Sequence, residues 1–251
     1  MGSGREAGQN TYEMEEYQDG FRRIESEVRE GNADLSGLGF WSLVRKVKLE
    51  PVLAEHWAEQ VGRIDRLSFE SRVRPRFPVA LGNAVLVLGA GIAVAVAWLG
   101  LELARDDPSS FLAGLLVLAA GAGLSAALHG PAHWLVGRLV GMRFVAYFLD
   151  GPLRIQPGLK VDYATYLRAP AGRRAAMHAA GAVASKIAPF AIFGWAYAVH
   201  RNAGYELLPE WSLWALLAFG LLQVVTDAIW STRHSDWKKV RRERAIARVA
   251  S

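Results

Sequence analysis

Four windows of mostly apolar residues constrain the fold of this chain more than any other feature. They cover residues 79–101, 111–135, 175–199 and 211–230. As helices, they are long enough to cross a bilayer core of about 30 Å. Only 21% of the 251 residues are charged and 52% are hydrophobic, so the polar residues must be concentrated between these windows. The sequence therefore predicts an all-α polytopic membrane protein, with four transmembrane helices in contact with the lipid bilayer.

The segments around these windows suggest three regions. Residues 1–77 form a polar cytoplasmic or interfacial arm, residues 78–237 a four-helix transmembrane core, and residues 238–251 a basic cytoplasmic tail. Within the core, a cytoplasmic loop at residues 142–174 contains short β-prone stretches broken by Gly-Pro and Pro-Gly pairs. This pattern favours a short β-hairpin in the loop.

The arm has two parts of opposite character. Residues 1–34 carry 4 Lys and Arg against 9 Asp and Glu, a net charge of −5, with few large apolar residues. We expect this part to contribute little to a core and to order as a helix only against something else, either a basic partner surface or the chain's own cytoplasmic lysines and arginines. Residues 39–69 have apolar residues at helical spacing, and Pro51 divides them into two helices. Two interpretations stay open for this stretch: a helix on the membrane surface, or a helical hairpin packed on the protein's own core.

Lysine and arginine are concentrated at the end of the arm, in the loop between the second and third windows, and in the tail. The other two loops hold only Arg105 and Arg201. Because cytoplasmic segments carry the excess of positive charge, both termini are expected in the cytoplasm. The predicted location is a bacterial or archaeal cytoplasmic membrane. The basic tail lacks an accompanying aromatic binding surface, so we expect no nucleic-acid partner.

The second window contains two histidines, His129 and His133, in the run LSAALHGPAHWLVGRLVGMRF. Four residues apart on a helix, they share one face, as two ligands of one metal ion would. Ionisable groups in a membrane are costly without partners, which indicates a functional site. The alternative is a pair that hydrogen-bonds to neighbouring helices or lies among lipid headgroups.

Two further ionisable residues fall at the same depth. Measured along their helices from the flanking arginines, His178 and Asp227 lie with the histidine pair roughly 6 to 14 Å inside the cytoplasmic boundary. These residue types are zinc ligands. The sequence predicts a zinc site formed by His129, His133 and Asp227, with His178 as a fourth ligand or as a hydrogen-bond partner of a ligand.

These segments resemble the site-2 protease family of intramembrane zinc metalloproteases. The run HGPAHWLVGRLVG, from His129, is similar to the family's HExxH zinc helix, and AAGAVASKIAP, from Ala179, to its third core helix with a Gly-Pro-Leu-Ala-Asn pattern. Asp227 lies where the family has its third ligand. The resemblance spans roughly residues 111–237 and implies a site-2-protease-like core.

The chain differs from this family at the positions of the catalytic and substrate-binding residues. Where the family has a glutamate that acts as general base on metal-bound water, this sequence has Gly130, followed by Pro131. Ser185 stands where the family has its asparagine, and Lys186 follows it. Lys186 could pair with Asp227 in place of a metal, but metal ligation by Asp227 is the preferred interpretation.

The sequence therefore predicts a degenerate member without a catalytic residue. We expect a non-proteolytic accessory or scaffolding subunit that binds a membrane-protein partner and retains a zinc site. Two alternatives stay open. One is an active zinc-dependent intramembrane endopeptidase with a base other than glutamate. The other is a haem- or chlorophyll-binding subunit of an electron-transfer or light-harvesting complex, because intramembrane histidines also ligate tetrapyrroles.

Overall fold

The computed structural model describes residues 3–150, 156–202, 208–229 and 235–249, and the side chains of 3–13, 227 and 228 lie outside this description. The chain divides into two compact units. Unit 1 comprises Met1–Arg76, Gly141–Ala171 and Ala245–Ser251, and unit 2 comprises Phe77–Val140 and Gly172–Arg244. Each unit has its own hydrophobic core.

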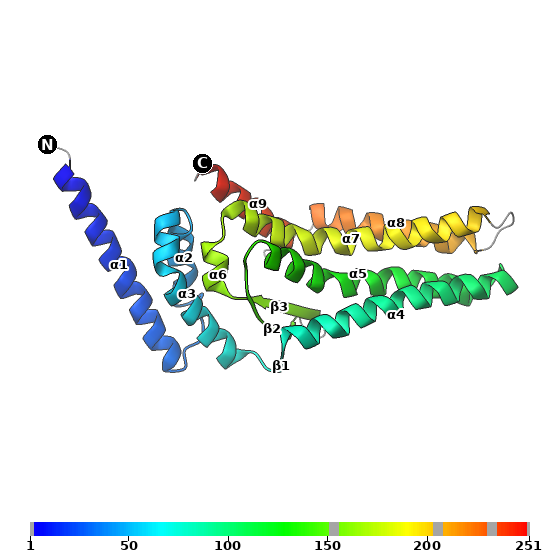
Figure 1. Ribbon diagram of the computed structural model, residues 1–251, viewed down its shortest axis with the longest axis horizontal. Coiled ribbons are helices and arrows are strands. Elements are labelled where there is room, and N and C mark those ends of the chain that lie inside the picture. Colours follow the sequence, from blue (N-terminus) through cyan, green and yellow to red (C-terminus); the bar gives the residue numbers. More distant parts are fainter. Residues whose placement is uncertain (1–2, 151–155, 203–207, 230–234, 250–251) are drawn as a thin grey trace. The chain divides into compact units, whose positions relative to one another are not determined.

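Long apolar helices make up most of unit 2 (Figure 1). They are α4 (Val79–Asp106), α5 (Phe111–Leu139), α7 (Ala171–Asn202) and α8 (Glu210–Ile229), followed by α9 (Asp236–Val249). Among the described residues, α4, α5 and α7 are long and apolar enough to cross a membrane, whereas the apolar stretch of α8, Glu210–Thr226, is shorter. Three of the four predicted spans are thus found as candidate membrane-spanning helices, as expected for an integral membrane protein.

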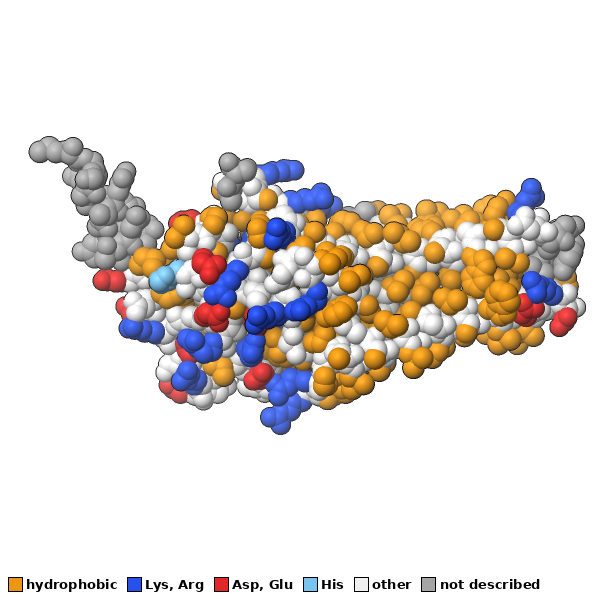
Figure 2. All heavy atoms as spheres, viewed as in Figure 1, with side chains coloured by type: hydrophobic (Ala, Val, Ile, Leu, Met, Phe, Trp, Pro, Cys, Tyr) orange, Lys and Arg blue, Asp and Glu red, His pale blue; other side chains and the backbone are white. Residues whose placement is uncertain are grey.

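Small residues let α4 and α5 pack closely. Ala93, Ala97 and Ala104 of α4 are buried in the same core as Ala113 and Ala120 of α5. Close backbone approach through small residues is the usual way in which membrane helices associate. Figure 2 shows that the visible outer face of the long helices is covered mainly by hydrophobic side chains, as contact with lipid requires.

Unit 1 has a helical core in which residues 3–72 supply three elements. These are α1 (Ser3–Arg29), α2 (Phe40–Val47) and α3 (Pro51–Arg72), and Pro51 begins α3 as predicted, since proline fits the first turn of a helix. Trp57, Val61 and Ile64 of α3 pack with α2 in one buried cluster. Of the two interpretations of residues 39–69, the structure therefore has the hairpin packed on the protein's own core.

The first helix corrects one expectation. Phe21 and Ile24 are fully buried, and Tyr17 and Val28 nearly so, in the cluster that α2 and α3 complete. The prediction that residues 1–34 contribute little to a core is wrong. The apolar residues of α1 are few, but they recur every three or four positions and form one continuous apolar face.

The loop between α5 and α7 contains the predicted hairpin. Strands β2 (Phe144–Asp150) and β3 (Gln156–Val161) pair antiparallel, with Phe144 opposite Val161. With the short β1 (Arg76–Phe77), they form a sheet in the order β1-β2-β3, so the described chain is mostly but not wholly helical. A short helix, α6 (Tyr163–Arg168), follows β3.

Candidate metal centre

The two histidines of α5 face one point. Their Nε2 atoms lie 3.3 Å apart, and the imidazole rings are nearly perpendicular. Since α5 continues through Pro131 to Leu139, the four-residue spacing keeps both rings on one face of the helix. Sequence reasoning predicted this pairing.

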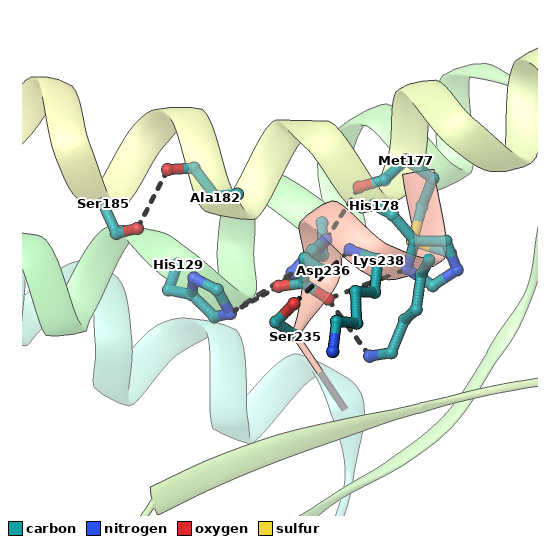
Figure 3. A network of polar contacts seen from close by, with 10 residues as sticks. His129, Met177, His178, Ala182, Ser185, Ser235, Asp236 and Lys238 are labelled. Atoms are coloured by element: carbon teal, nitrogen blue, oxygen red, sulfur yellow. Dashed lines mark hydrogen bonds and ion pairs between the residues drawn. The ribbon is translucent and has the colours of Figure 1, made fainter. Parts of the chain in front are cut away.

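The third group is Asp236, the first residue of α9 (Figure 3). Its Oδ2 lies 3.1 Å from Nε2 of His133 and 3.4 Å from Nε2 of His129. Within the described part of the chain, these residues form the one group of three or more His, Cys, Asp or Glu whose ligand atoms converge closely enough to hold a metal ion. All three belong to unit 2.

Two local interactions position Asp236. Ser235 precedes α9, and its hydroxyl accepts a hydrogen bond of 3.4 Å from the backbone N–H of Lys238, as an N-terminal cap does. Further along α9, the buried Glu243 carboxylate accepts a hydrogen bond of 2.5 Å from the buried Arg174 of α7. The cap sets where α9 begins, and the ion pair fixes it against α7.

The separations within the group match tetrahedral metal coordination. With metal–ligand bonds of about 2.0–2.1 Å, neighbouring ligand atoms of a tetrahedral zinc site lie about 3.3 Å apart. The three separations here are 3.1, 3.3 and 3.4 Å. One ion could therefore contact all three atoms without rearrangement.

The protonation of His133 also fits a metal ligand. Its Nδ1 lies 2.7 Å from the carbonyl oxygen of Met177, which can only accept, so Nδ1 carries the proton. With the proton on Nδ1, Nε2 of a neutral His133 is the ring nitrogen that can offer its lone pair to a metal ion. Without a metal, a proton on Nε2 can instead be donated to the Asp236 carboxylate, 3.1 Å away. A carbonyl behind the ring is also the usual partner of a metal-bound histidine.

The second oxygen of Asp236 faces two other groups. Lys239 Nζ lies 3.1 Å from Oδ1, and His178 Nδ1 lies 3.8 Å from it. Burial raises the pKa of the Asp236 carboxyl, but the hydrogen bonds with His129 and His133 outweigh burial and hold its pKa below its ordinary value. Asp236 is therefore ionised, as a metal ligand must be.

Close packing leaves no room for a side chain at one glycine of the site. Gly181 of α7 lies against the His133 imidazole, and a Cβ there would overlap the ring. This glycine lets α7 approach α5 at the site. Gly130 of α5 is buried and supplies no functional group beside His129.

Of the other predicted site residues, His178 lies beside this centre, whereas Ser185 and Lys186 have other surroundings. Ser185 donates a hydrogen bond of 3.2 Å to the Ala182 carbonyl, and its own carbonyl accepts one of 2.6 Å from Ser125. Lys186 lines a separate cavity. The side chain of Asp227 lies outside the described residues.

Sequence reasoning missed Asp236 because it sought ligands only inside the apolar windows. The available signal was the pair Ser235-Asp236, which is typical of a helix start, directly before the basic run of the tail.

Comparison of the chain with protein-family models, with curated proteins and with solved structures found no match. The resemblance to site-2 proteases stays a prediction, and the functional argument rests on the geometry of the site.

Proposed function

We propose that this chain is an integral membrane protein that binds a zinc ion through His129, His133 and Asp236 and does not hydrolyse peptide bonds. The observation that carries the proposal is the triangle of Nε2, Nε2 and Oδ2 atoms with tetrahedral spacing. Two imidazoles and one carboxylate are a donor set that zinc prefers, and three protein ligands leave a fourth position for water or His178.

The missing glutamate next to His129 supports a non-proteolytic role. Zinc peptidases of the HExxH type use the glutamate next to the first histidine as general base. Here that position is Gly130, and the second oxygen of the Asp236 carboxylate is engaged by Lys239. Among the residues that the structure describes, no further carboxylate would thus be poised to take a proton from metal-bound water.

In this proposal the core is a degenerate site-2-protease-like bundle in which α8 is the fourth span and both termini are cytoplasmic. The protein then acts as an accessory or scaffolding subunit for a membrane-protein partner. The folded helical core of unit 1 supports this role, because it gives the polar part of the chain a stable surface of its own.

Metal analysis tests the proposal. The full-length protein, purified in detergent without chelators, is expected to contain about one zinc per chain, and His129→Ala should remove it. His56→Ala is the matched control, because His56 is exposed and belongs to unit 1. Zinc below a tenth of an equivalent in the unmodified protein, or equal zinc in both variants, would overturn the zinc site.

Proteolysis is measured in the same preparations. The unmodified protein should leave a panel of transmembrane peptide substrates intact, and Gly130→Glu tests whether a base restores cleavage. Zinc-dependent cleavage by the unmodified protein would contradict the non-proteolytic part of the proposal while leaving the metal site in place.

One observation favours a second candidate, a zinc-dependent endopeptidase with His178 as its base. The His178 Nδ1 atom lies 3.8 Å from Asp236 Oδ1, close to the metal position. In that case, His178→Ala would abolish cleavage and keep the zinc. Haem or chlorophyll gains no support from this geometry, because both Nε2 atoms are directed at one carboxylate oxygen rather than at the centre of a flat ring.

A further inference from the structure

The two oxygens of the Asp236 carboxylate contact different groups. Oδ2 lies 3.1 Å from Nε2 of His133 and 3.4 Å from Nε2 of His129, whereas Oδ1 lies 3.1 Å from Nζ of Lys239. A carboxylate can bind a metal ion through one oxygen or through both. In the proposed zinc site, the lysine therefore holds the oxygen that a second metal–oxygen bond would need.

Helix α9 keeps Lys239 at this oxygen. Lys239 follows Asp236 by three residues, so both side chains lie on one side of the helix. The Ser235 cap sets the first turn, and Glu243, one turn after Lys239, forms a buried ion pair with Arg174 of α7. The ammonium is thus carried by a segment of α9 that is fixed on both sides of it.

Partial burial strengthens this ion pair. The side chain of Asp236 is 14% exposed and that of Lys239 is 34% exposed. Opposite charges that are partly removed from water attract each other more strongly than charges in full contact with it. The neighbouring Lys238 carries the same charge, but its ammonium forms no ion pair with the described residues, and its backbone N–H donates to Ser235 (Figure 3).

We propose that Lys239 is a positioning residue that restricts Asp236 to one metal–oxygen bond and makes the site selective for zinc over oxygen-preferring ions such as Mn²⁺. The inference rests on the proposed zinc site. Zinc in proteins is satisfied by four ligands, whereas Mn²⁺ suits octahedral sites that are rich in oxygen. With Asp236 bound through Oδ2 alone, three protein atoms and one further ligand complete a tetrahedral set, and a six-coordinate ion finds too few oxygens.

Cobalt substitution reports the number of metal ligands. Co²⁺ takes the place of zinc in the full-length protein in detergent, and its visible absorption is intense at four-coordinate sites and weak at sites with more ligands. We expect intense bands from the unmodified protein and from Lys239→Arg, which keeps a cation near Oδ1. Lys239→Met removes the charge and should lose these bands while still binding one cobalt per chain. Lys238→Met is the matched control and should keep them.

Metal competition measures the selectivity. The ratio of zinc affinity to manganese affinity should fall at least about tenfold in Lys239→Met, the lower limit for losing a partner of a ligand, and stay unchanged in Lys238→Met. Intense four-coordinate bands together with unchanged selectivity in Lys239→Met would overturn the inference.

X-ray absorption at the zinc edge tests the unmodified protein, so the inference can be decided even if Lys239→Met does not fold. We expect four ligands and a carboxylate bound through one oxygen, and a carboxylate bound through both oxygens would overturn the inference while leaving the zinc site in place. An unmodified protein that takes up neither zinc nor cobalt would instead refute the zinc site itself, and the role of Lys239 with it.

Discussion

If the proposed zinc site forms, adding one methyl group at Gly181 should remove its metal. The Cβ of Gly181→Ala would lie 2.6 Å from Cε1 of His133 and closer still to two other ring atoms, whereas ordinary contacts begin at 3.4 Å. The ring would therefore have to withdraw by about 1 Å, well beyond the ±0.2 Å that metal–ligand distances tolerate. The same movement would break the 2.7 Å hydrogen bond to Met177.

The size of the effect follows from that displacement. Losing a supporting partner of a ligand typically weakens metal binding about 10- to 100-fold, and displacing the ligand itself should cost at least about 100-fold. Affinity is measured by competition with a zinc chelator in detergent. Gly194→Ala is the control, because Gly194 lies in the same helix and a Cβ there meets nothing within 4 Å. Equal zinc affinity in the two variants would refute the packing of His133 on α7.

Three further predictions concern the third ligand and unit 1. Asp236→Asn should lower zinc affinity at least about 100-fold and Asp227→Asn should not, as measured by the same competition; the opposite result would restore the ligand predicted from sequence. Glu25→Gln should lower the free energy of unfolding by about 1–2 kcal/mol in thermal melts, because Glu25 accepts bonds of 2.9 and 3.3 Å from Arg63. Since Arg63 holds the pKa of the Glu25 carboxyl below its ordinary value of 4.5, this contribution is present above about pH 4.5 and lost as the pH falls; equal acid sensitivity of the variant and the unmodified protein would contradict it. Phe21→Ala should cost about 3–5 kcal/mol, because Phe21 is fully buried against Trp57, and an unchanged melting temperature would show that α1 does not belong to the folded core.

The elements that were predictable from sequence are those fixed by local pattern. The length of the apolar windows predicts α4, α5 and α7, and Pro51 predicts the start of α3. The Gly-Pro and Pro-Gly pairs indicate the hairpin. The pairing of His129 with His133 is also local, since the helix repeat alone brings residues four apart together.

What sequence could not provide depends on contacts between distant segments. Helix α1 has few apolar residues, so its sequence alone does not indicate a buried face. Phe21 and Ile24 become core residues because α2 and α3 supply the rest of the cluster around them. Asp236 is 103 residues from His133, and nothing in the local sequence of either indicates that they meet.

The position of Asp236 at the start of α9 lowers the energetic cost of burying its charge. A carboxylate buried at mid-membrane carries a large desolvation cost, whereas the first turn of a helix favours negative charge through its exposed N–H groups and dipole. Asp236 takes this second position, and Lys239 one turn later adds a compensating cation 3.1 Å from its outer oxygen. In the proposed zinc site, the candidate span α5 contributes two ligands that are neutral when they bind metal, and the polar helix α9 contributes the anionic one. The proposed His-His-Asp set is then complete without a ligand's charge within a candidate span, and the start of α9 would matter for metal binding as much as the histidines do.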